Sequence, residues 1–227
     1  MRLLETTAAR TGFPVHLVEK DYYLTIVLAG IGSLSPHLVF KGGTCQNKIY
    51  FSYFRLSEDL DFSMALPGGK LGRAKRRQMM APIKEGIGLF LQRYGLQIEN
   101  LDKAGRNQST QYIYSATYAS VVMGARQSIK IEIGLRAPLY LAPVLKPIQH
   151  VFLHPFTEQP LFEGGFARCM SLKEAVAEKM RAAATRPSIA IRDFYDLGYL
   201  VDQGFNFEDA EIWDLFKWKL EEGGFDT

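Results

Sequence analysis

The sequence predicts an α/β (α+β) protein in which strands and helices alternate in the first half and helices alone make up the last part. Between residues 37 and 64 the pattern is strand, Gly-Gly-Thr, helix, strand. Three segments rich in Tyr, Ile, Val and Thr, at 96–101, 110–120 and 128–136, are typical of further strands. From Ser171 onward, apolar residues recur at helical spacing. We therefore expect a mixed sheet flanked by helices, followed by a helical C-terminal half.

Composition limits the classes of protein that the chain can be. Its 227 residues, 47% hydrophobic and 22% charged, indicate a folded protein with a sizeable core. Cys45 and Cys169 are the two cysteines and lie far apart in the sequence, so a disulfide framework is not expected and a reducing cytoplasm is the predicted location. Since no apolar run reaches the roughly 20 residues that cross a bilayer, no membrane partner is expected.

Two long helices are predicted in the first half. After Pro14, apolar residues recur three or four apart as far as Gly32, which indicates a helix packed on the core. A long basic helix is expected over 72–94, broken or kinked at Pro82 because proline lacks an amide hydrogen. A turn at Pro67-Gly68-Gly69 precedes it.

The second half divides at a proline-rich stretch. Prolines at 138, 143, 147, 155 and 160 predict an extended connector over 141–170, between a domain at 1–140 and a helical domain at 171–227. Ser171 and Glu174 have the Ser-x-x-Glu spacing of a capping box, so the first helix of that domain should begin there. A last helix is expected over 208–220.

Two short motifs indicate phosphate chemistry. In Lys41-Gly42-Gly43-Thr44, the glycines let the backbone approach a triphosphate, and Thr44 can cap the helix expected over 45–51. In Asp59-Leu60-Asp61, a strand would place both carboxylates on one face and Leu60 in the core. Such a pair can bind Mg²⁺, which prefers oxygen ligands and retains substrate phosphates. Together the motifs favour nucleotidyl transfer.

A third carboxylate is needed opposite such a pair in two-metal transferases. Within 128–136, Lys130 and Glu132 share one face of the predicted strand while Ile131 and Ile133 take the other. Glu132 is therefore the candidate third metal ligand, although an exposed glutamate on a strand is an equally ordinary reading.

The segment KGGTCQNKIYFSYFRLSEDLDF resembles the AbiEii/AbiGii-type toxin nucleotidyltransferases, with Leu56 where the family usually has Phe. Three further segments are similar to that family: VEKDYYLTIVL, KIEIGLR and SLKEAVAEKMRAAATRPSIAIRDFYDL. The fourteen residues between Thr44 and Asp59 are a departure, because many polymerase-β-like enzymes have a shorter connection. The resemblance implies a polymerase-β-like nucleotidyltransferase core that uses an NTP and Mg²⁺ or Mn²⁺. It also implies an RNA acceptor, with the 3′ end of tRNA favoured, and a possible cognate antitoxin.

The motifs and the resemblance together give the candidate site residues. The metal ligands would be Asp59, Asp61 and Glu132, and the nucleotide would be held by Lys41, Gly42, Gly43, Thr44 and Ser57. Lys179 and Asp193 complete the catalytic set that the resemblance implies. Lys173 instead of Lys179, and Asp196 instead of Asp193, remain open as the functional pair; Arg192 and Asp196 could simply form a surface ion pair. The resemblance further suggests that Lys20 and Asp21 approach the nucleotide, although both could be surface residues.

The acceptor and the activity itself have alternatives. Six basic residues and no acidic one lie between positions 70 and 84, which suits an RNA backbone, but a solvated helix face explains them equally well. The acceptor could instead be a protein or a small molecule, or the chain could be a non-catalytic nucleotide- or RNA-binding module. The presence of Asp59, Asp61, Glu132, Lys179 and Asp193 favours an enzyme.

Overall fold

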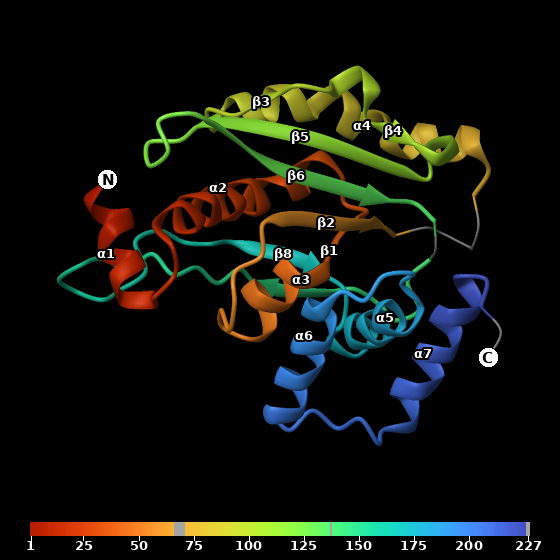
Figure 1. Ribbon diagram of the computed structural model, residues 1–227. Coiled ribbons are helices and arrows are strands. Elements are labelled where there is room, and N and C mark those ends of the chain that lie inside the picture. Colours follow the sequence, from red (N-terminus) through yellow and green to blue (C-terminus); the bar gives the residue numbers. More distant parts are fainter. Residues whose placement is uncertain (66–70, 137, 226–227) are drawn as a thin grey trace. The chain divides into compact units, whose positions relative to one another are not determined.

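A computed structural model describes residues 1–65, 71–136 and 138–225 (Figure 1). The turn expected at Pro67-Gly68-Gly69 lies outside these residues. The chain divides into two compact units: unit 1 contains Met1–Pro138 and Val144–Cys169, and unit 2 contains Leu139–Pro143 and Met170–Thr227. Unit 1 has the predicted mixed α/β architecture, and the described part of unit 2 is helical.

Unit 1 is built around an eight-stranded sheet with the order β3-β5-β6-β2-β1-β8-β7, and β4 pairs with β5 off this path. Pairs β2/β6 and β1/β8 are parallel and the other pairs are antiparallel, so the sheet is mixed, as predicted. The strands are β1 (Leu38–Lys41), β2 (Asp59–Met64), β3 (Gln97–Ile98), β4 (Gly105–Arg106), β5 (Gln111–Ala119), β6 (Arg126–Gly134), β7 (Val144–Pro147) and β8 (Phe166–Cys169).

The core of unit 1 forms where two long helices pack on this sheet. These are α2 (Val15–Ile31) and α4 (Arg73–Gln92), and a shorter α1 (Arg2–Thr11), which the sequence did not predict, precedes them. Buried side chains from both helices cluster with alternate residues of the central strands, namely Leu24, Leu28, Ile31, Met80, Ile83, Ile87, Leu60, Phe62, Ile131 and Ile133. Because side chains alternate along a strand, this packing directs the intervening residues to the other face.

Several boundaries differ from the sequence expectations. Helix α4 continues through Pro82 instead of breaking there. The strand expected over 96–101 contains Gln97–Ile98 alone. Residues 144–147 and 166–169, within the expected connector, form β7 and β8, and β8 joins β1 at the pair Phe40 and Cys169. Ala167 and Cys169 are buried because alternate residues of β8 face the core.

Cys45 and Cys169 are free thiols buried in unit 1. Cys45 lies at the end of α3 (Gly42–Cys45), and burial together with a hydrogen bond to Cys169 raises the pKa of its thiol well above the usual value. The thiolate is therefore disfavoured, which agrees with a packing role for Cys45.

The described part of unit 2 contains three helices: α5 (Leu172–Thr185), α6 (Ile191–Asp202) and α7 (Ala210–Glu222). The Ser171 hydroxyl accepts a hydrogen bond from the Glu174 amide, so the predicted N-cap is present. The Glu174 carboxylate does not complete a capping box. It is fully buried, accepts the amides of Tyr140 and Leu141, and pairs with Lys219 at 2.6 Å. This ion pair joins α5 to α7.

Among the described residues, no helix combines the length and apolar character that a transmembrane span requires.

Candidate active site

Strands β2 and β6 bring the candidate acidic residues together in unit 1. The two strands are parallel, with Asp59 opposite Lys130 and Asp61 opposite Glu132. Since Leu60 and Ile131 are buried in the core, these four residues share the other face of the sheet. The register between the strands could not be read from the sequence, yet it places Glu132 beside Asp61.

Lys130 lies among these carboxylates. Its ammonium group is 3.2 Å from Asp59 Oδ2 and 3.4 Å from Glu132 Oε2. On the other side, Gln111 Nε2 of β5 donates a hydrogen bond of 2.6 Å to Glu132 Oε1. Glu132 is thus oriented by contacts from both sides, and the side chains of Asp59 and Lys130 are about 40% exposed to solvent.

Asp61 is the most perturbed carboxylate of the cluster. Burial raises its pKa from 3.8 to about 6, and the neighbouring carboxylates of Glu132 and Asp59 raise it as well. Lys130 and Lys41 act in the opposite direction without cancelling the effect of burial. A nearby cation stabilises the ionised form of a carboxylate in this environment more than that of an exposed one. The reason is that the cation offsets both the cost of burial and the repulsion from the neighbouring carboxylates.

The diglycine lies directly against this carboxylate. Lys41 pairs with Asp61 in the antiparallel β1/β2 ladder, and Gly42 follows with φ of 78°, a conformation that favours glycine. A Cβ on Gly42 would lie 2.6 Å from Asp61 Oδ2. A Cβ on Gly43 would lie 2.7 Å from Arg55 Nη2 and 3.4 Å from Ser57 Oγ. Gly42 is therefore required by its positive φ and by the close approach of its backbone to Asp61, whereas a Cβ on Gly43 would displace the end of the flexible Arg55 side chain.

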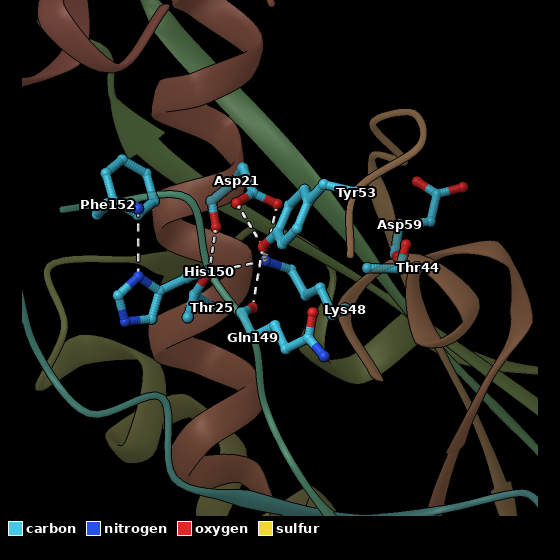
Figure 2. A network of polar contacts seen from close by, with 9 residues as sticks. All are labelled: Asp21, Thr25, Thr44, Lys48, Tyr53, Asp59, Gln149, His150 and Phe152. Atoms are coloured by element: carbon cyan, nitrogen blue, oxygen red, sulfur yellow. Dashed lines mark hydrogen bonds and ion pairs between the residues drawn. The ribbon is translucent and has the colours of Figure 1, made fainter. Parts of the chain in front are cut away.

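Thr44 does not cap a helix as the sequence suggested. The helix begins earlier, at Gly42, so Thr44 lies inside α3, which is followed by a π-helical turn, η2 (Gln46–Tyr50). The Thr44 hydroxyl donates a hydrogen bond to the main-chain carbonyl of Asp59 (Figure 2). Its side chain is buried, and it ties the diglycine helix to the first residue of β2.

The donor set of this face suits a hard divalent cation. Across the described ranges, no group of three or more His, Cys, Asp or Glu side chains is arranged closely enough to hold a metal ion. The side chains of Asp59, Asp61 and Glu132 nevertheless supply only oxygen donors from one face of adjacent strands. Lys130 already places one positive charge among them, and the raised pKa of Asp61 shows that this charge is insufficient to offset its burial. By donor type the three carboxylates suit Mg²⁺ or Mn²⁺, but in this structure they are not grouped closely enough to hold the ion.

In unit 2, Lys179 lies between two buried carboxylates of α6. Its ammonium group is 3.1 Å from Asp193 Oδ1 and 2.8 Å from Asp196 Oδ2. Asp193 also pairs with Arg186 at 3.1 Å. The surface pair expected between Arg192 and Asp196 is wrong, because Asp196 is 1% exposed and faces Lys179.

Lys173 differs from Lys179 in its surroundings. It is 42% exposed and pairs with Asp209 and Glu211, both at the start of α7. The two lysines are six residues apart on α5, which turns them about 120° from each other around a helix with roughly 3.6 residues per turn. Of the two lysines, Lys179 is the one that contacts two buried carboxylates.

The sequence model of the family described as "Nucleotidyl transferase AbiEii toxin, Type IV TA system" matches residues 26–225. The chain belongs to the AbiEii nucleotidyltransferase toxin family. A search of curated proteins finds no significant match. The AbiEii assignment thus rests on a match that spans β1, β2 and β6 of unit 1 and all three helices of unit 2.

Two solved structures share the fold of this AbiEii protein. MenT4, a nucleotidyltransferase toxin from Mycobacterium tuberculosis, aligns with a TM-score of 0.67 and 18% identity over 99% of this chain and 73% of its own. JHP933 from Helicobacter pylori aligns with a TM-score of 0.53 and 19% identity over 90% of this chain and 78% of its own. At this identity the similarity shows the fold alone.

Two side chains that contact the AbiEii candidate site were not among the residues predicted from the sequence. Arg55 lies beside Gly43, and Gln111 orients Glu132. Arg55 stands in the same segment as Ser57 and Asp59, so its position in the sequence could have identified it as a candidate site residue. Gln111 had no such signal, because its contact depends on the β5/β6 register.

Proposed function

We propose that this AbiEii protein transfers a nucleoside monophosphate from an NTP to the 3′ end of an RNA, with tRNA as the favoured acceptor. The carrying observation is the packing of Gly42 against Asp61 on the face that also holds Asp59 and Glu132. A phosphate-binding backbone and an acidic cation site thus adjoin each other, which is the arrangement that NTP-dependent transfer requires.

The metal requirement is part of this proposal. Asp59, Asp61 and Glu132 would hold Mg²⁺ or Mn²⁺. The cation would replace the Lys130 ammonium group as the partner of the Asp59 and Glu132 carboxylates. A bound divalent ion neutralises phosphate charge and lowers the pKa of an attacking hydroxyl. The ionised form of Asp61 is the competent one, because a protonated carboxyl group is a poor ligand for a cation.

The backbone of Gly42 and Gly43 would bind the triphosphate, assisted by Lys41 and Ser57. Thr44 would act through the main chain, because its hydroxyl already bonds Asp59. In the reaction, the acceptor hydroxyl oxygen attacks the α-phosphorus, a new phosphodiester bond forms, and pyrophosphate leaves.

The roles of Lys179 and Asp193 in unit 2 follow from their chemistry. We propose that Lys179 stabilises the negative charge that develops on the leaving pyrophosphate, since a lysine can stabilise a developing anion. Asp193 and Asp196 would hold the ammonium group in place before the substrate binds, and the contacts of Lys179 with both carboxylates support this assignment.

An RNA acceptor is supported by the charge of unit 1. Basic residues outnumber acidic ones there, whereas the reverse holds in unit 2. Arg73, Lys75, Arg77 and Lys84 are exposed on α4. Lys70, the sixth member of the basic group, lies outside the described residues. Such a group suits phosphate backbones.

The test is incubation of the protein with each labelled NTP, total tRNA, and Mg²⁺ or Mn²⁺. We expect labelled RNA with one or more nucleotides and none with Asp61→Asn. Asp102→Asn is the matched control, because it removes an exposed carboxylate of the same unit outside the site. Folded protein that labels no RNA with any of the four nucleotides would refute RNA transfer.

Labelling of a protein or small molecule in a cell extract, in place of RNA, would redirect the proposal to another acceptor. Nucleotide binding without transfer to any acceptor would identify a binding module. A cognate antitoxin, which membership of a toxin–antitoxin family implies, would be recognised by relief of growth inhibition on co-expression.

A further inference from the structure

A fully buried lysine contacts loop 51–58, which lies between the diglycine motif and Asp59. Lys48, in η2, has 0% exposure, and its ammonium group is 2.8 Å from Asp21 Oδ1 and 2.8 Å from Thr25 Oγ1, both on α2. It also donates a hydrogen bond to the Tyr53 hydroxyl (Figure 2). The expectation that Asp21 could be a surface residue is therefore wrong, since it is 2% exposed.

This network uses every donor of the Lys48 ammonium group. An ammonium group has three donors, and Lys48 uses them on Asp21, Thr25 and Tyr53. The Tyr53 hydroxyl lies 2.9 Å from Asp21 Oδ2 and 3.0 Å from the carbonyl of Gln149, to which it can donate. The hydroxyl accepts from Lys48 and has a single hydrogen to donate, which Asp21 Oδ2 and the Gln149 carbonyl share as alternative acceptors, and these three neighbours define the position of the Tyr53 ring.

Tyr53 belongs to a loop whose backbone conformation is locally unfavourable. Ser52 and Tyr53 have φ of 47° and 67°, values that residues other than glycine rarely adopt. Residues 55–58 follow without regular secondary structure before β2 begins at Asp59. Tertiary contacts must therefore hold this loop, and the hydroxyl of Tyr53 anchors it to α2 and to Gln149.

The same loop delivers two residues to the diglycine. Arg55 and Ser57 follow Tyr53 by two and four residues, and both lie close to Gly43. Lys48 lies five residues after Gly43 on the other side of the loop. A shift of Tyr53 would therefore move Arg55 and Ser57 relative to the backbone that the proposed function assigns to the triphosphate.

We propose that Lys48, Asp21 and Tyr53 are positioning residues of the nucleotide site, which fix loop 51–58 so that Arg55 and Ser57 stand beside Gly43. This inference rests on the proposed function, since it assumes that a nucleotide binds at the diglycine. It also explains how the long connection between Thr44 and Asp59 is kept in one conformation.

A purely stabilising role is the competing explanation, and the chemistry of buried ion pairs separates the two. Replacing both members of a buried ion pair with apolar residues is often neutral or stabilising. If the network only stabilised the fold, Asp21→Leu with Lys48→Met would preserve nucleotide binding. If the network positions the loop, the same double variant would fold and bind nucleotide poorly, because the Tyr53 hydroxyl would lose its partners Lys48 and Asp21 and keep the Gln149 carbonyl alone.

The experiment measures the Kd of a non-transferable α,β-methylene NTP in the presence of Mg²⁺, together with thermal unfolding and the kcat and KM of transfer. The variants are Tyr53→Phe and the Asp21→Leu/Lys48→Met pair. The matched control is Tyr22→Phe on α2, where the tyrosine ring contacts Phe152 and Phe162.

We expect Tyr53→Phe to remain folded with a melting temperature lowered by a few degrees, because a donor of buried Lys48 loses its partner. It should weaken nucleotide binding roughly tenfold, with KM rising more than kcat falls. The double variant should weaken binding at least as much, and Tyr22→Phe should leave binding unchanged. Wild-type affinity in folded Tyr53→Phe would overturn the inference while leaving the proposed function intact. Failure of the wild-type protein to bind any of the four nucleotides would overturn the proposed function and this inference with it.

Discussion

Asp61→Asn should stabilise the fold while it abolishes transfer. Burial raises the pKa of Asp61 from 3.8 to about 6, so the ionised side chain is less stable in the folded than in the unfolded state. With about 1.4 kcal/mol per pKa unit, this shift of roughly two units corresponds to an upper limit of about 3 kcal/mol. An asparagine of nearly the same shape removes the charge, and we expect it to raise the free energy of unfolding by about 1–3 kcal/mol at pH 7.5.

The pH dependence follows from the direction of the shift. Between pH 3.8 and about 6 the folded wild-type protein holds a proton that the unfolded chain releases, so its stability relative to Asp61→Asn increases as the pH falls. Below the lower value both states are protonated, and the advantage of the variant should disappear.

Urea unfolding of the metal-free protein at several pH values measures this difference, with Asp102→Asn as a control that changes an exposed carboxylate. A variant that is less stable than wild type at pH 7.5, or a gain that does not decrease toward pH 4, would refute the assignment of a buried, destabilising charge to Asp61.

Three further variants probe separate parts of the chain. Gly42→Ala should lower the rate of transfer by about 100-fold in the labelling assay, because the new Cβ displaces the Asp61 carboxylate. Gly12→Ala is the control and should retain activity, because Gly12 has a similar φ but no atom near the position of the new Cβ. Lys219→Met should lower the free energy of unfolding, measured in urea, by about 3–5 kcal/mol, because it leaves a buried carboxylate of α5 without its ion-pair partner. Lys173→Met, at an exposed ion pair, should change the free energy of unfolding little. Equal losses in the two variants would contradict this explanation. Asn47→Leu should raise the melting temperature, because the buried amide has no hydrogen-bond partner among the described residues; a marked loss of stability would show that the amide is satisfied.

Local patterns predicted most of the secondary structure. The alternation in Asp59–Met64 and the apolar spacing of Val15–Ile31 identified β2 and α2, because each element exposes one face to a core and the period records that face. The break considered at Pro82 does not occur, because tertiary packing of α4, with Met80 and Ile83 fully buried on either side of it, outweighs the local cost of proline.

The shared face of the candidate residues could be predicted where they lie within one motif, and not where their contacts depend on pairing between distant segments. Asp59 and Asp61 could be placed on one face from their spacing alone. Gln111 could not be connected to Glu132, because a shift of one residue in the β5/β6 register would turn Gln111 to the opposite face.

The sequence by itself determined the family, the carboxylates and the diglycine, since these are properties of residue type and short spacing. Only the tertiary structure decided that Thr44 bonds Asp59, that Asp21 is buried against Lys48, and that Asp196 faces Lys179. The physical reason is that the protonation and partners of a polar side chain depend on its burial and on groups far away in the chain. Those quantities exist only once the segments have packed.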